Sequence, residues 1–121
     1  MRLVLLLSVL SAAGCAGTQQ ASSFARVDAD LDVAFQKDVL KRLEPLAAAG
    51  DTDPKNFAFL YDRVATNEER PQRYGTQGEC LGPGSWKPNP LQEPARVDEL
   101  RAAIGLEPLS EYTASNSKGC F

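Results

Sequence analysis

The sequence predicts a mainly α-helical domain with one small β-hairpin, an α+β fold made of a helical hairpin, a two-stranded hairpin and a closing helix. Two segments, beginning near Asp30 and Asp53, carry apolar residues every three or four positions, which is the period of an amphipathic helix. Residues 72–91 contain too many glycines and prolines for a helix and favour a turn between short strands. A third helical pattern opens at Pro94.

The first fourteen residues are typical of a secretory signal peptide and are not counted in the domain. Arg2 gives a positive start, residues 3–10 are apolar apart from Ser8, and residues 11–14 are small. This apolar run is much shorter than the roughly 20 residues that a membrane-spanning helix needs. We therefore expect the protein to be exported.

Cys15 directly follows Ala12, Ala13 and Gly14, an arrangement that resembles the bacterial lipobox, whose cysteine becomes the lipidated N-terminus. A lipobox usually has leucine where Ala12 stands. The alternative is therefore an ordinary secreted protein, cut nearby, with Cys15 removed or left as a free thiol. Ala16, rather than aspartate, follows the cysteine, and in a host with two membranes this favours the outer one. The sequence thus predicts an envelope lipoprotein that faces the periplasm.

Composition argues against several classes of partner and chemistry. The chain has a net charge of −3, and cleavage before Cys15 removes one basic residue, Arg2, and no acidic one. Its scattered lysines and arginines form neither the basic stripe that nucleic acid needs nor the basic cluster that anionic lipid attracts. The chain contains no histidine, so Ser–His–Asp catalysis and His-containing zinc sites are excluded. We expect no cofactor and no metal.

The mature chain divides into a tether and one domain. Residues 15–28 are rich in alanine, serine, glutamine and threonine and lack apolar periodicity, as expected of a flexible tether. Residues 29–121 form the domain, whose polar tail from Thr113 onward is expected to be loose unless a disulfide holds it. In the first helix, Pro45 predicts a kink or an end, and Gly50 closes the last turn. The apolar face comprises Leu31, Phe35, Val39, Leu43 and Leu46.

The second helix is predicted to begin with Asp53 as its N-cap and Pro54 at its first position, and to end before Pro71. One face packs on the first helix as an antiparallel hairpin, and Asp62 faces solvent or the site. The apolar residues of that face are Phe57, Leu60, Tyr61 and Val64.

The glycine- and proline-rich region predicts two strands around a turn at residues 81–84. Tyr74 and Thr76 fall on the first strand, and residues 85–87 form the second. An isolated hairpin is marginal in water, so Trp86 is expected to anchor it on the helices. The alternative is that Trp86 lines an aromatic groove for a ligand.

The third helix carries its apolar face C-terminal to Pro94, and one further turn is expected at residues 108–112. Gly105 suits the position that follows a helix end. The face is formed by Val97, Leu100, Arg101 and Ile104.

Two cysteines remain in the domain, Cys80 and Cys120. In an exported protein such a pair is most simply a disulfide, which would stabilise the domain by roughly 4 kcal/mol for a loop of about 40 residues. Two unrelated thiols are the alternative. A nucleophilic Cys80 would lack a histidine partner.

Residues 70–77 concentrate hydrogen-bonding side chains between two breakers, Pro71 and Gly75. Their two guanidinium groups, two amides, phenol and hydroxyl exceed what one turn requires, and arginine suits carboxylate or phosphate groups. The segment predicts a ligand-binding surface, although the same groups can instead satisfy the backbone of the loop. The candidate ligand contacts are Arg70, Gln72, Arg73, Tyr74, Thr76, Gln77 and Trp86.

Four elements together resemble a bacterial domain family of unknown function over about residues 29–114. They are Asp62-Arg63-Val64, residues 70–77, residues 86–90 and residues 94–112. The resemblance implies a mainly helical domain with a small β-hairpin and no assured activity. Family members usually carry a histidine-containing segment upstream, where this chain has Asp28 and Leu31. Histidine-dependent chemistry, if the family performs it, is therefore not expected here.

We therefore expect a non-catalytic binding or interaction module, anchored to the membrane by lipid, with an unknown protein or envelope ligand as its partner. One alternative is a hydrolase that acts on an envelope polymer through Glu69 or Glu79. Another is a periplasmic inhibitor or an immunity-type lipoprotein.

Overall fold

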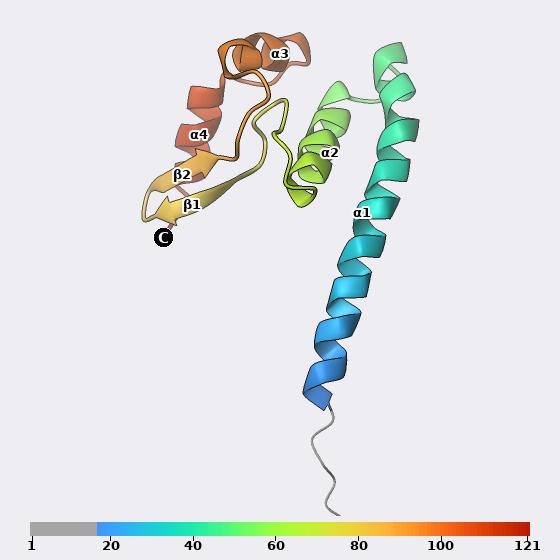
Figure 1. The fold of residues 1–121 in the computed structure, drawn as a ribbon. Helices are drawn as coiled ribbons and strands as arrows, with labels where there is room; N and C mark the ends of the chain where they lie inside the picture. Colours follow the sequence, from blue (N-terminus) through green and yellow to red (C-terminus); the bar gives the residue numbers. More distant parts are fainter. Residues whose placement is uncertain (1–16) are drawn as a thin grey trace, which may run out of the picture.

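The computed structural model describes the backbone of residues 17–121 and the side chains of residues 32–121 (Figure 1). The predicted signal peptide, residues 1–14, and the predicted lipidation site, Cys15, lie outside the described residues. The predicted α+β fold class is confirmed, since helices and one antiparallel hairpin account for the regular structure of residues 17–121. The elements are α1 (Gly17–Ala49), α2 (Pro54–Asn67), β1 (Gly78–Gly82), β2 (Ser85–Pro88), the 3-10 turn η1 (Pro94–Arg96), α3 (Val97–Ala103) and α4 (Leu109–Ser117).

The first helix is longer than predicted. Residues 17–28, expected to form a flexible tether, are the first turns of α1, which spans 33 residues. Alanine, glutamine and arginine in this stretch are good helix formers, and no proline interrupts it before Pro45, which α1 accommodates without ending. The N-terminal half of α1 therefore projects beyond α2 as a rod (Figure 1).

The helical hairpin is confirmed, with α1 and α2 side by side and antiparallel (Figure 1). Gly50 follows α1 with a φ of 79°, in the left-handed region that glycine reaches without strain. The Asp53 side chain then accepts a hydrogen bond from the Lys55 backbone N–H at 3.0 Å, and Pro54 takes the first helical position, as predicted.

The β-hairpin is confirmed, but its first strand is shifted along the chain. β1 begins at Gly78 and pairs with β2 in the register Cys80 to Trp86, so Tyr74 and Thr76 do not lie on a strand. Their backbone N–H groups donate to the carboxylate of Asp62 and are not available to a ladder. The prediction of a strand at Tyr74 and Thr76 was wrong because the buried Asp62 carboxylate accepts the N–H bonds that strand pairing would need.

Trp86 anchors the hairpin on α4. Its ring meets that of Tyr112 edge to face, with 5.6 Å between centroids, and its backbone N–H donates to Ser117 Oγ. A Cβ at Gly78 would lie 2.3 Å from the Trp86 ring, so only glycine fits there. β1 can thus approach the indole closely.

The C-terminal tail is ordered by α4 and by the disulfide between Cys80 and Cys120, which confirms the predicted pairing. Their Cα atoms are 5.6 Å apart, and Cys120 is buried. The Gly84 N–H also donates to the Cys120 carbonyl at 2.8 Å. The tail expected to be loose is therefore helical as far as Ser117 and is tied to the hairpin.

Replacing both cysteines, Cys80→Ser with Cys120→Ser, is expected to lower the free energy of unfolding by about 2–4 kcal/mol, because the unfolded chain loses a cross-link over some 40 residues. Urea denaturation of both proteins with and without reductant measures this difference. Reductant should destabilise the native protein and leave the double variant unchanged. Equal free energies of unfolding for the native protein and the double variant, both measured without reductant, would contradict the prediction.

The core is small and has polar side chains at its centre. Its buried apolar residues include Ala58, Val64, Tyr74 and Leu106. Three buried side chains with no exposed surface are polar or charged: Asp62, Gln72 and Arg101. Asp62 and Arg101 bond residues 70–77 from outside, Gln72 bonds them from within, and together the three fix the position of this segment.

Candidate binding site

The buried carboxylate of Asp62 fixes the conformation of the 70–77 segment through hydrogen bonds. It accepts backbone N–H bonds from Arg73 at 2.9 Å, from Tyr74 at 3.1 Å and from Thr76 at 2.9 Å. The Thr76 hydroxyl donates to it as well, at 2.9 Å. A buried carboxylate is tolerated when several donors replace its water, and here four donors from one loop do so. Asp62 therefore determines the path of residues 73–76.

Gln72 closes the same loop with its side chain. Its Nε2 donates to the Gln77 carbonyl at 2.7 Å and to the Asn89 carbonyl at 3.0 Å, while its Oε1 accepts from the Gln77 N–H at 2.9 Å. Its backbone joins Pro90 and Gln92 in a short bridge. Gln72 thus links the 70–77 segment to the chain that follows β2.

Arg101 holds the loop from the other side. Its Nη1 donates to the Tyr74 carbonyl at 2.7 Å and its Nε to the Glu107 carbonyl at 2.6 Å. Its guanidinium carbon lies 4.7 Å from the centre of the Tyr112 ring, and the Tyr112 hydroxyl donates to the Thr76 carbonyl. Burial lowers the pKa of Arg101, and Nη2 has no hydrogen-bond partner among residues 32–121. The backbone N–H and C=O of Tyr74 are therefore bonded to a buried carboxylate and a buried guanidinium, respectively.

The structure divides the predicted ligand contacts into an inner and an outer set. Gln72, Tyr74 and Thr76 are buried, and their polar groups complete the network just described. Arg70 is exposed, whereas Arg73 and Gln77 are half-buried. Trp86 packs beneath the hairpin against Tyr112. A ligand on the surface can therefore contact Arg70, Arg73 and Gln77 directly.

A pocket of about 320 Å³ lies beside Arg70. Pro71 and Pro90 give it apolar walls, and Glu69, which lines it too, has a φ of 56° that is uncommon outside glycine. Thr66 and Asn89 complete the lining, so the pocket offers a hydroxyl, an amide, a carboxylate and a guanidinium. Of the two glutamates proposed for hydrolysis, Glu69 lines this pocket and Glu79 does not.

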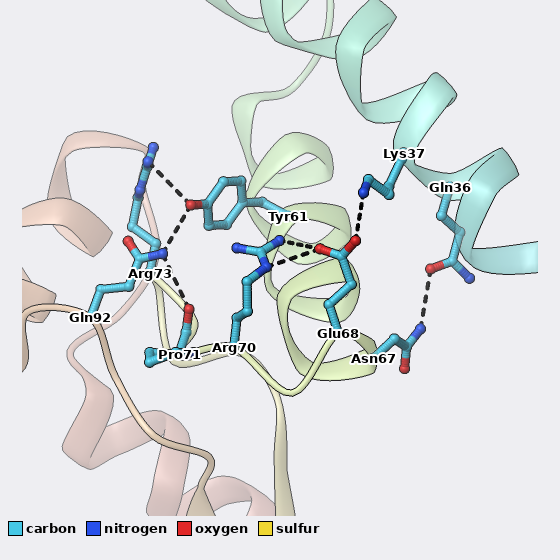
Figure 2. Close-up of polar contacts among 9 residues, drawn as sticks. All are labelled: Gln36, Lys37, Tyr61, Asn67, Glu68, Arg70, Pro71, Arg73 and Gln92. Atoms are coloured by element: carbon cyan, nitrogen blue, oxygen red, sulfur yellow. Dashed lines mark hydrogen bonds and ion pairs between the residues drawn. The ribbon is translucent and has the colours of Figure 1, made fainter. Parts of the chain in front are cut away.

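An ion-pair cluster joins the pocket edge to α1 (Figure 2). Glu68 accepts from Lys37 Nζ at 2.6 Å and from Arg70 Nε at 2.9 Å, and Arg70 Nη2 donates to the same carboxylate. The hydrogen bonds of Lys37, then of Arg70, hold the pKa of Glu68 below its ordinary value of 4.5. Glu68 thus links α1 to the end of α2 and orients Arg70.

Because the folded state lowers the pKa of Glu68, its contribution to stability is present above pH 4.5 and is lost as pH falls through the lowered value. We expect Glu68→Gln to be less stable than the native protein at pH 7 and to approach it in acid. Thermal unfolding of both proteins between pH 7 and pH 3 measures this. Asp38→Asn, on the exposed side of α1, serves as a control that should show little difference. A stability gap that does not narrow in acid would contradict the prediction.

A second cluster surrounds the hydroxyl of Tyr61 (Figure 2). Gln92 Nε2 donates to this oxygen at 3.0 Å and also to the Pro71 carbonyl at 3.1 Å. Arg73 Nη2 donates to it at 3.3 Å, and the Arg73 guanidinium carbon lies 4.4 Å from the centre of the Tyr61 ring. Burial opposes the charge of Arg73, but the Tyr74 and Tyr61 hydroxyl groups raise its pKa on balance.

Several residues that shape the site were not among the predicted contacts. Asp62 was expected only to face solvent or the site, and Arg101 only to lie on a helix face. Tyr61 was assigned to packing, and Gln92 carried no local signal, being 31 positions from its partner. The charge of Asp62 on an apolar helix face was the one signal that sequence offered. No group of potential ligands within residues 32–121 is arranged to hold a metal ion.

These features describe a small α+β protein in which buried polar side chains fix the loop that carries Arg70 and Arg73. The chain belongs to a family of unknown function, DUF6624, whose model matches residues 8–117. The expected membership of a family without known function is thereby confirmed. No curated protein and no solved structure matches the chain. None of the helices within residues 17–121 has the length and apolar character that crossing a membrane requires.

Proposed function

We propose that the protein is a non-catalytic binding module of the bacterial cell envelope, held by lipid on Cys15, and that residues 70–77 present its binding surface. The observation that carries this proposal is that hydrogen bonds within the domain already pair the inward polar groups of residues 70–77. Asp62, Gln72 and Arg101 occupy its inward polar groups and leave Arg70 and Arg73 facing outward. A loop fixed before binding loses less entropy when a ligand arrives, which favours recognition.

The shape of α1 fits an anchored protein. Cys15 lies two residues before the first turn of α1, and 33 helical residues extend about 50 Å at 1.5 Å per residue. A lipid at Cys15 would place the domain at the far end of a rod rather than on a flexible tether. Two acyl chains or more are needed for stable attachment.

The anchor is tested by fractionation of cells that produce the native protein or Cys15→Ala. The native protein should sediment with membranes and take up a palmitate analogue, and the variant should be soluble. Sedimentation of Cys15→Ala with membranes would remove the anchor from the proposal, and would leave the binding surface untouched.

The binding surface is tested by capture from envelope extract with the immobilised mature chain. Arg70→Ala combined with Arg73→Ala should lose the captured partner, because both outward guanidinium groups are removed. Arg42→Ala, an exposed arginine on α1, is the matched control and should retain it. Retention of the same partner by the double variant would overturn the proposed surface.

A further inference from the structure

The hydrogen-bond donors around Tyr61 point to the kind of group that this surface binds. The Tyr61 oxygen already accepts from Gln92 and from Arg73. A phenol has a single hydrogen, and with two N–H donors directed at the oxygen this hydrogen must point away from both of them. Among residues 32–121 no acceptor receives it. Tyr61 is therefore an oriented donor whose hydrogen no residue between 32 and 121 accepts.

Arg73 and Arg70 supply further donors beside this hydroxyl. The hydrogen bond to Tyr61 occupies one N–H of Arg73, and a contact with the Tyr74 hydroxyl engages the guanidinium further, which leaves the rest of its five N–H groups for a ligand. Arg70 uses Nε and Nη2 on Glu68, so Nη1 is the N–H group of this guanidinium that can reach the Tyr61 hydroxyl or a ligand. Arg70 lies close enough to Tyr61 for the phenol to raise its pKa, after the larger effect of Glu68. The Tyr61 hydroxyl, Arg73 and Arg70 thus lie together, and the Tyr61 oxygen and the Glu68 carboxylate satisfy only part of the N–H groups of the two arginines.

Gln92 has a positioning role in this cluster. Both hydrogens of its amide are used, one on Tyr61 and one on the Pro71 carbonyl. It therefore holds the phenol against the 70–77 segment and does not itself contact a ligand. Donation to the phenol oxygen from two sides also makes its hydroxyl a stronger donor, since hydrogen bonds in a chain polarise one another.

We infer that Tyr61, Arg70 and Arg73 bind the free carboxylate of a peptide, an inference that rests on the proposed function. The charges agree: Lys37, Arg70 and Arg73 are basic, against the carboxylate of Glu68 in this cluster and that of Glu69 in the adjoining pocket. Glu68 itself shows the geometry, because Arg70 grips its carboxylate with two N–H groups. Glu68 also repels a doubly charged phosphate more than a singly charged carboxylate.

A peptide fits the surroundings better than a sugar does. The pocket beside Arg70 has proline walls and the hydroxyl and amide of Thr66 and Asn89, which suit a short side chain and a peptide group. Sugars favour an open aromatic face, and the Tyr61 ring face is covered by Arg73 at 4.4 Å. Arg70 and Pro71 belong to both sites, so a carboxylate at Tyr61 can continue into this pocket.

The test is an NMR titration of the full mature chain, carrying Cys15→Ser to prevent lipidation, with acetylated tetra-alanine as the probe. A free C-terminal carboxylate should shift the side-chain amide of Gln92 and the Arg73 Nε–H. The C-terminally amidated peptide should bind at least about tenfold more weakly. Glucuronate, which carries its carboxylate on a sugar, and inorganic phosphate, whose charge near pH 7 is higher, should both bind more weakly than the acid peptide.

Two variants assign the effect to this cluster. Tyr61→Phe removes the hydroxyl and keeps the ring under Arg73, and Arg73→Gln removes the charge; each should weaken binding by about tenfold or more. Arg42→Gln should bind like the native chain. Circular dichroism confirms that each variant is folded, and a variant that unfolds is replaced by Arg70→Gln.

Equal binding of the acid and amide peptides, or undiminished binding by Tyr61→Phe and Arg73→Gln, would overturn the inference. Tighter binding of phosphate or glucuronate would overturn the ligand class. These failures are separable from failure of the proposed function. If the arginine double variant still loses the partner captured from extract, the binding surface stands without this ligand.

Discussion

Asp62→Ala is expected to lower the free energy of unfolding by about 5 kcal/mol, because four buried donors lose their common acceptor. Those donors are three backbone N–H groups and the Thr76 hydroxyl. Each unpaired buried donor costs about 1–3 kcal/mol, with partial relief as water enters the gap. Small domains have only about 5–15 kcal/mol of stability, so a large unfolded fraction is expected.

Urea denaturation of the native chain, Asp62→Ala and Asp62→Asn measures this effect. Asparagine keeps one acceptor oxygen at nearly the same place, and its loss of stability should be intermediate. Asp38→Ala, an exposed aspartate of α1, should unfold like the native chain. If Asp62→Ala resembled Asp38→Ala, the carboxylate would not be the element that organises the loop.

Arg101→Ala is expected to lower the free energy of unfolding by about 4 kcal/mol. The carbonyls of Tyr74 and Glu107 lose their donor, the Tyr112 ring loses the guanidinium stacked on it, and Asp62 loses a neighbouring positive charge. The cost is set by these lost partners, since burial already disfavours the charge of Arg101 itself.

A double-mutant cycle separates the shared part of this cost. Asp62 bonds the backbone N–H of Tyr74 and Arg101 bonds its C=O, so the losses of stability in Asp62→Ala and Arg101→Ala should not be additive: once either has released the loop, the second costs less. Arg42→Ala is the control for Arg101→Ala. Strictly additive losses would show that the two residues stabilise separate parts of the domain.

Much of the fold follows from local sequence signals. Asp53 and Pro54 mark the start of α2, Gly105 follows α3 with a φ of 78°, and the two cysteines pair as predicted. These signals succeed because capping, positive φ and cross-linking depend on a few neighbouring residues or on a single pair.

The errors arise where distant side chains decide the local structure. Tyr74 and Thr76 have the alternation of a strand, but Asp62, more than ten positions earlier, takes their N–H groups. The start of α1 was missed because helix propensity without an apolar face gives a weak pattern.

The sequence located the candidate site but did not separate its buried residues from those at the surface. Density of polar groups identifies residues 70–77, yet it does not distinguish the buried Gln72 from the outward Arg73. Tyr61 and Gln92 are 31 positions apart in the sequence, and no local pattern predicts their contact. Burial and long-range hydrogen bonds separate scaffold from surface, and both are properties of the folded chain.

The most direct measurement compares the free energy of unfolding with partner capture for single alanine variants of the 70–77 segment. Arg73→Ala and Gln77→Ala should unfold within about 1 kcal/mol of the native chain, because they remove half-buried side chains and leave the backbone bonds to Asp62 and Gln72 in place, and both should lose the partner. Tyr74→Ala, which empties a buried site, should lose about 3–5 kcal/mol. If all three variants instead lost stability together, residues 70–77 would be scaffold throughout and the binding surface would lie elsewhere.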